Sequence, residues 1–189
     1  MSAVQDIDRL RGWFAEKILG VNEFRGEHSV TVALDSIAVF LSRCHRDLGY
    51  DLLLDVSSVD HFGDDPRFEV VYELATVDDS KHLRVKVAVG EDEEIPSVVG
   101  IWPGADWHER EVWDMMGIRF SGHPNLKRIL MWEGYPFFPL RKDFPLAGRP
   151  SEMPDVAFTG VAPLEGGPFV TCAGGEDPVA REPRARSVD

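Results

Sequence analysis

Three segments with the composition of β-strands follow one another with only short polar stretches between them. They cover residues 50–59, 67–76 and 82–89 and are rich in Val, Leu, Phe and Tyr. The stretches between them contain Gly63-Asp64-Asp65-Pro66 and Asp78-Asp79-Ser80-Lys81, which are residues typical of turns. Because strands joined by short connections usually pair in opposite directions, this order predicts an antiparallel sheet at the centre of the fold.

Helical periodicity precedes this strand region. Apolar residues recur at helical spacing and predict a first helix that ends at Gly20; they are Val4, Ile7, Leu10, Phe14 and Ile18. Residues 29–34 alternate as a strand does, and Ser36 is placed to cap a second helix that runs to Leu48, before Gly49. We therefore predict an α+β fold with mixed α/β order: a mainly antiparallel sheet with helices on one face.

The end of the chain has a different character. After about Gly148, closely spaced Gly and Pro residues leave no periodic element of useful length. We predict a core domain at residues 1–148 and an extended, irregular C-terminal tail at 149–189. Apolar residues recur between Ser151 and Val170, so we expect the tail to wrap on a partner to about residue 170 and to be mobile beyond it.

The charge of the chain bounds its partners. The formal net charge is −13, from 33 acidic and 20 basic residues, which argues against nucleic acid and anionic lipid as direct partners. No apolar run approaches the ~20 residues that a membrane-spanning helix needs, and the start lacks a basic region followed by an apolar stretch. We expect a cytoplasmic protein whose attachment to a membrane goes through other proteins.

A third helix is expected at residues 106–116, within the most unusual segment of the chain. Asp106 can cap it and Glu109 can complete a capping box. Arg110 and Asp114 are one turn apart and can form an ion pair, and Gly117 is placed to end the helix. Charges interleaved with Trp and Met are typical of contacts between subunits, although spacing alone favours a solvated helix face.

The segment 109–130 resembles the signature of the thirty-kilodalton subunit, designated C, of the proton-translocating NADH:quinone oxidoreductase, respiratory complex I. The resemblance rests on Glu109, Arg110, Glu111, Asp114, Met115, Met116, His123, Lys127, Ile129 and Leu130. It continues through Glu133-Gly134-Tyr135-Pro136 and through the run Leu140-Arg141-Lys142-Asp143-Phe144-Pro145-Leu146. This chain departs from the family pattern by the extra residues Phe137-Phe138-Pro139, which lengthen the connector without adding a catalytic group.

The resemblance implies a structural subunit in the hydrophilic arm of such a complex. It implies partners that form the quinone site and carry the terminal iron–sulfur clusters, with NADH, FMN, iron–sulfur clusters and quinone bound by those partners and no cofactor in this chain. It implies a peripheral location on the cytoplasmic side of the cell membrane. Two alternatives remain open: the equivalent subunit of a membrane-bound hydrogenase or formate hydrogenlyase, and a free-standing protein-binding module.

The residues themselves provide no complete cofactor site. Cys44 and Cys172 are the only cysteines, too few for the four ligands of an iron–sulfur cluster, and Cys44 is expected to be a buried, inert thiol. His108-Glu109 begins like a zinc-protease helix, but Val112 stands where the second His would be. We expect no catalytic site in this chain, and we expect His123 to make a hydrogen bond in a buried turn.

The signature region differs in charge from the rest of the chain. Residues 117–150 carry six basic residues against two acidic ones, a net charge of +4. A basic, Pro-rich and aromatic segment suits docking on an acidic partner surface, although a solvated basic loop is an equal alternative. We predict that the subunit interface includes Glu109, Arg110, Glu111, Asp114, His123, Lys127, Arg128, Arg141, Lys142 and Asp143.

Overall fold

The computed structural model describes residues 3–78 and 80–145. The helices are α1 (Ala3–Phe14), α2 (Ile37–Leu48) and α3 (Ala105–Met116), with short 3-10 turns η1 (Ala15–Lys17) and η2 (Leu34–Ser36). The strands are β1 (Ile18–Phe24), β2 (Glu27–Val32), β3 (Leu52–Asp60), β4 (Phe68–Ala75), β5 (His82–Val89), β6 (Glu94–Pro96) and β7 (Arg119–Ser121).

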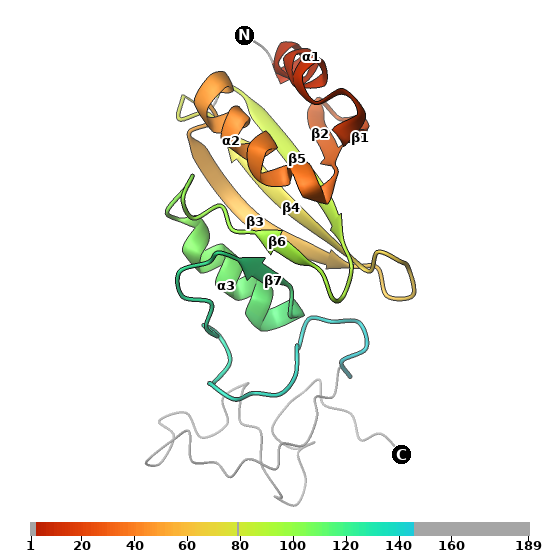
Figure 1. Ribbon diagram of the computed structural model, residues 1–189, viewed down its shortest axis with the longest axis vertical. Helices are drawn as coiled ribbons and strands as arrows, with labels where there is room; N and C mark the ends of the chain where they lie inside the picture. Colours follow the sequence, from red (N-terminus) through yellow and green to blue (C-terminus); the bar gives the residue numbers. More distant parts are fainter. Residues whose placement is uncertain (1–2, 79, 146–189) are drawn as a thin grey trace, which may run out of the picture. The chain divides into compact units, whose positions relative to one another are not determined.

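The centre of the fold is a five-stranded mixed sheet in the order β1-β2-β5-β4-β3. The three predicted strands form an antiparallel meander, β3-β4-β5, and only β2 and β5 run parallel to each other. Helices α1 and α2 cover one face of this sheet (Figure 1), and buried side chains of α3, which packs beside β3, join the same core. The predicted α+β class and mainly antiparallel sheet are confirmed.

The two faces of the sheet differ because side chains alternate along each strand. On the helix-covered face, Tyr72 of β4 lies opposite Val85 of β5, and both are fully buried. On the other face, Glu73 lies opposite Arg84 and the two form an ion pair, as do Glu69 and Lys86 at 2.9 Å. Charge pairing thus replaces helix packing on the second face.

The predicted first helix is too long. Helix α1 ends at Phe14, and residues 18–24 form β1 instead of continuing to Gly20 as a helix. Arg25 and Gly26 both have positive φ, 53° and 83°, which makes a tight hairpin turn that pairs β1 with β2. The spacing of apolar residues alone does not predict strand β1, because Ile18 fits the pattern of a helix as well as that of a strand. The strand forms through its pairing with β2, which lies further along the chain.

Other boundaries differ by a few residues. The strand expected at 29–34 is β2 (Glu27–Val32), and residues 34–36 form the turn η2. Ser36 stands at the N-cap of α2, but its hydroxyl donates to Asp35 at 2.7 Å rather than capping the helix. Gly49 ends α2 with φ of 75°, as expected.

The chain divides into two compact units, and the first ends at Glu133. The described part of the second unit, 134–145, is held by ring contacts of the inserted residues. Phe137 packs against Tyr135 and Phe144, with ring centres 5.6 and 6.1 Å apart, and Arg141 stacks on Phe138. The predicted boundary at 148 and the tail 149–189 lie outside the described residues. In the described part, no helix has both the length and the apolar character required to cross a membrane.

Candidate functional site: the α3 clamp

Helix α3 begins one residue earlier than expected and without a side-chain cap. Gly104 occupies the N-cap, and Gly117 ends the helix with φ of 79°, its N–H donating to Trp113 O at 2.8 Å. The prediction that Asp106 caps this helix is wrong. Asp106 lies instead beside the imidazole of His123.

Asp114 holds a loop that returns across α3. Its Oδ2 accepts hydrogen bonds from three consecutive backbone N–H groups, those of Ile129, Leu130 and Met131, at 2.9, 2.7 and 2.8 Å. Its Oδ1 pairs with Arg128, which also donates to the Asp114 carbonyl at 2.9 Å. Burial raises the pKa of Asp114, but these donors outweigh burial, so the net pKa is lowered.

Arg110 fixes the same loop from the other side. Its Nε donates to Lys127 O at 3.0 Å and its Nη2 to Arg128 O at 3.2 Å, and its guanidinium lies 5.1 Å from the centre of the Trp107 ring. The predicted Arg110–Asp114 ion pair is wrong, because Arg128 occupies the carboxylate of Asp114. We call the set formed by Arg110, Asp114 and the loop 127–131 the α3 clamp.

Glu109 is fully buried on the inner side of α3. It accepts hydrogen bonds from the Ser97 hydroxyl at 2.6 Å and the Val98 N–H at 2.7 Å, so it forms no capping box. Burial raises its pKa, against the lowering effect of both donors and of His123. Ser97 was not singled out in the sequence, since a partner twelve positions before the helix residue leaves no local pattern.

His123 joins α3 to the turn that follows β7. Its side chain has no exposed surface, and the Asn125 N–H donates to its Nδ1 at 3.0 Å. Nε2 lies 3.3 Å from the Asp106 carbonyl, with the geometry of a hydrogen bond, and 3.1 Å from Asp106 Oδ1. The predicted buried turn hydrogen bond of His123 is confirmed.

The predicted interface residues therefore have different surroundings. The side chains of Glu109, Asp114 and His123 have no exposed surface in the described part of the chain, and they bond within this segment. Their place in a subunit interface stays a prediction. Arg128 is nearly buried beside Asp114. Among the predicted interface residues, Glu111 and Lys127 are exposed and lie in the first unit. Arg141, Lys142 and Asp143 lie in the second unit.

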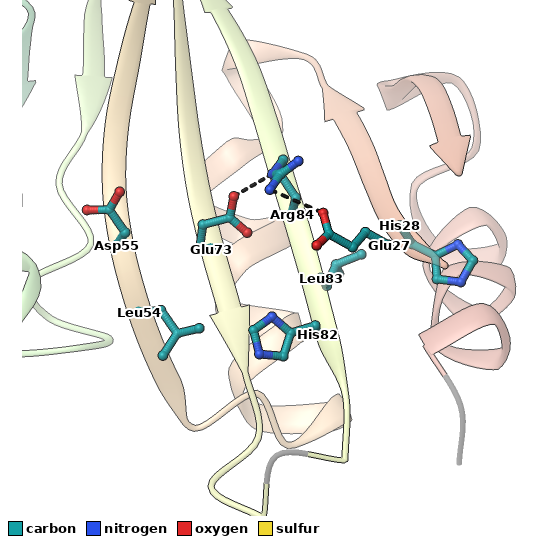
Figure 2. Close-up of a pocket in the computed structure, with 8 residues that line it drawn as sticks. All are labelled: Glu27, His28, Leu54, Asp55, Glu73, His82, Leu83 and Arg84. Carbon is teal, nitrogen blue, oxygen red and sulfur yellow. Dashed lines mark hydrogen bonds and ion pairs between the residues drawn. The ribbon is translucent and has the colours of Figure 1, made fainter. Parts of the chain in front are cut away.

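Two depressions lie on the described surface away from the clamp. One, of about 250 Å³, lies on the sheet face opposite the helices (Figure 2) and is lined by Glu27, His28, Leu54, Asp55, Glu73, His82, Leu83 and Arg84. Its arginine is already paired with Glu73 and lies 3.5 Å from Glu27, which neutralises the cation an anionic ligand would need. The other depression is lined by Leu48, Gly49, Asp51, Thr76, Val77, Asp78, Ser80 and Lys81, and Lys81 is paired with Asp6 at 2.8 Å.

Within the described ranges, His, Cys, Asp and Glu side chains form no group of three that could hold a metal ion. Cys44 is fully buried, as predicted, and burial raises the pKa of its thiol. Cys172 lies outside the described residues.

Comparison with known proteins places this geometry in a family. Residues 30–150 match the family described as the respiratory-chain NADH dehydrogenase 30 Kd subunit. In the NADH-quinone oxidoreductase of Rhizobium meliloti (strain 1021), the subunit designated C 2 is 40% identical over 156 residues, covering 82% of this chain and 86% of the relative. In the NADH-quinone oxidoreductase of Geotalea uraniireducens (strain Rf4), the subunit designated C is 46% identical over 145 residues, covering 76% and 88%.

One solved structure extends the similarity to another respiratory complex. A chain of the membrane-bound sulfane sulfur reductase, an archaeal respiratory membrane complex, has a TM-score of 0.64 and 26% identity, covering 76% of this chain and 85% of that chain. Together with the match over the clamp and the sheet, these relatives show that the chain belongs to the 30 Kd subunit family of respiratory-chain NADH dehydrogenase, complex I.

Proposed function

We propose that this chain is a non-catalytic structural subunit in the hydrophilic arm of a proton-translocating NADH:quinone oxidoreductase. In this role it braces the subunits that form the quinone site and hold the terminal iron–sulfur clusters. NADH, FMN, iron–sulfur clusters and quinone are bound by those partners. The chain is attached to the cytoplasmic side of the membrane peripherally, through the same partners.

The observation that carries this proposal is that the signature residues bond to other groups of the same chain. Asp114 and Arg128 bind each other and the backbone, and Glu109 is engaged by Ser97 and Val98. These side chains are buried and bonded to groups of the same chain, which supports a structural use of the signature. They stiffen one segment of the surface, which is what a bracing subunit requires, because electron transfer and quinone binding depend on fixed distances between cofactors.

The test separates the amount of assembled complex from its turnover. Asp114→Asn in the α3 clamp should reduce assembled complex in membranes, measured on native gels, while quinone reduction per assembled complex stays unchanged. Glu16→Gln, at an exposed acidic residue outside the clamp, is the matched control and should change neither quantity. Full assembly with lowered turnover per complex would contradict a purely structural role.

In the second candidate function, the chain has the same bracing role in a different respiratory complex. The archaeal sulfane sulfur reductase chain has a similar fold, which favours a role in a respiratory membrane complex that reduces another substrate. The relatives named as NADH-quinone oxidoreductase subunits are more similar, at 40 to 46% identity, which favours the first candidate. Purification through a tag on this chain decides between them, since the co-purified subunits and the substrate that the complex reduces differ. A chain recovered alone would instead support the free-standing binding module.

A further inference from the structure

The guanidinium of Arg110 is held in place by the described chain but has no carboxylate partner there. Its two hydrogen bonds end on carbonyl oxygens, those of Lys127 and Arg128, and no carboxylate lies within ion-pair distance of it among the described residues. Asp114, one helical turn away, is occupied by Arg128 and three backbone N–H groups. Elsewhere the partly buried arginines of the sheet carry carboxylate partners, as in the pairs Arg67–Asp60 and Arg84–Glu73.

Two large apolar side chains of the same segment are exposed. Trp107, on which Arg110 stacks, is 59% exposed, and Leu130, whose backbone is held by Asp114, is 61% exposed. Lys127 is also exposed and has no ion pair in the described chain. Tryptophan and arginine are among the residue types that most often dominate the energy of protein–protein contacts.

The α3 clamp holds these groups in place before any partner binds. Leu130 and Met131 are fixed through backbone N–H groups, and the Arg110 guanidinium is fixed by two carbonyls and by the Trp107 ring. Surface groups that are already ordered lose little conformational entropy on binding. The arrangement is therefore suited to a partner rather than to solvent alone.

We propose that Trp107, Arg110, Lys127 and Leu130 form a docking surface, the α3 patch, for an acidic side chain flanked by apolar groups on a neighbouring subunit of the same complex. The proposal rests on the structural role argued above and adds the chemistry of the partner. A partner carboxylate supplies the counter-ion that Arg110 lacks, and Trp107 and Leu130 exclude water around that pair, which strengthens it.

Alanine variants of the exposed apolar residues test the patch in the intact system. Trp107→Ala and Leu130→Ala should leave the thermal unfolding of the isolated full-length chain nearly unchanged, because both side chains are exposed, and should weaken incorporation into the complex roughly tenfold or more. Phe24→Ala is the matched control: Phe24 is 64% exposed and Arg25 stacks on it at 5.1 Å, the same separation as in the Arg110–Trp107 pair. Normal incorporation of both patch variants, or an equal loss in the Phe24 variant, would overturn the proposal.

Chemical crosslinking tests the acidic partner directly. Treatment of the purified wild-type complex with a zero-length carbodiimide should join Lys127 to an Asp or Glu of another subunit, identified by mass spectrometry. A product that joins Lys127 to residues 146–189 of the same chain would assign the patch to an intramolecular occupant and contradict the proposal. The absence of any Lys127 product would contradict it as well.

The outcomes for the patch and for the structural role are distinguishable. Failure of the patch appears as normal incorporation of Trp107 and Leu130 variants, which leaves bracing through other surfaces intact. Failure of the structural role appears as lowered turnover in fully assembled complex, whichever residue is changed.

Discussion

Asp114 and Glu109 are two buried carboxylates on one helix, in surroundings that shift their pKa in opposite directions. Asp114 accepts from three N–H groups and Arg128, and its net pKa is lowered from an ordinary value of 3.8. Glu109 has fewer donors for its depth, and burial raises its pKa above 4.5. The charged form of Asp114 therefore stabilises the fold, whereas the charged form of Glu109 opposes it.

This contrast predicts opposite effects of two conservative substitutions on the isolated chain. Asp114→Asn should lower the free energy of unfolding at pH 7 by about 3 to 5 kcal/mol, because Arg128 loses its buried partner. Glu109→Gln should be neutral or stabilising at pH 7, since the amide can still bond Ser97 and Val98 and carries no charge. Thermal and urea unfolding of each variant measure both values, with the exposed Glu111→Gln as a control near zero.

The stabilities of the two variants should also depend on pH in different ways. The stabilisation from Asp114 is fully present above about pH 4 and disappears as pH falls through its lowered pKa, so the gap between wild type and Asp114→Asn should close in acid. The stability gained from protonated Glu109 is fully present below pH 4.5 and is lost as pH rises through its raised pKa. Glu109→Gln should thus match wild type in acid and equal or exceed it at neutral pH. If Glu109→Gln lost as much stability at pH 7 as Asp114→Asn does, the raised pKa of Glu109 would be contradicted.

At the scale of elements, helix α3 and the loop 127–131 act as one unit although only the helix is regular. The loop has no strand or helix of its own, and the Asp114 carboxylate takes the role that a neighbouring strand would play for its N–H groups. Irregular backbone of this kind is stable only when its polar groups have partners. We therefore expect the loop to be ordered together with the helix that holds it.

Hydrogen exchange checks this coupling. The amides of Ile129, Leu130 and Met131 should exchange slowly in the wild-type chain, at rates comparable to amides inside α3, because opening the loop requires release from Asp114. In Asp114→Asn these three amides should lose more protection than amides of β5. The amide of Asp92, in a turn without such a partner, is the control for rapid exchange. Rapid exchange at 129–131 in the wild type would show that the carboxylate does not order the loop.

Local and long-range features differed in how well the sequence predicted them. The meander β3-β4-β5 and the helix α2 were predicted because alternation, helical period and turn residues lie within each segment. The sequence did not predict the length of α1, the strand β1 or the partner of Asp114, because each depends on residues far along the chain. Arg110 illustrates the reason: its spacing to Asp114 suggested a helix pair, yet Arg128, fourteen positions after Asp114, competes more effectively for that carboxylate. The signature was identifiable as a pattern, but its use inside the fold required the three-dimensional arrangement.

For the whole molecule, the described core depends on the first unit. Its buried members extend from Ile7 to Phe120, with Leu126 packed against them. We predict that truncation after Gly148 leaves thermal unfolding of the isolated chain within about 2 °C of the full-length value, a shift below that expected for 1 kcal/mol in a chain of this size. The same truncation should reduce incorporation into the complex. Unfolding of the truncated chain would place the tail in the core, and normal incorporation would deny it a role in assembly.

The parallel pairing of β2 with β5 also determines when the fold can close during synthesis. Val30 lies beside Val85, so β2 gains its second neighbour only after the whole β3-β4-β5 meander has left the ribosome. Until then the β1-β2 hairpin lacks this strand neighbour, although Val30 and Val32 are fully buried in the finished protein. The Asp6–Lys81 pair likewise cannot fix α1 before residue 81 has emerged. The N-terminal third is thus translated first and completed late, which makes the nascent chain most dependent on chaperones just before β5 appears.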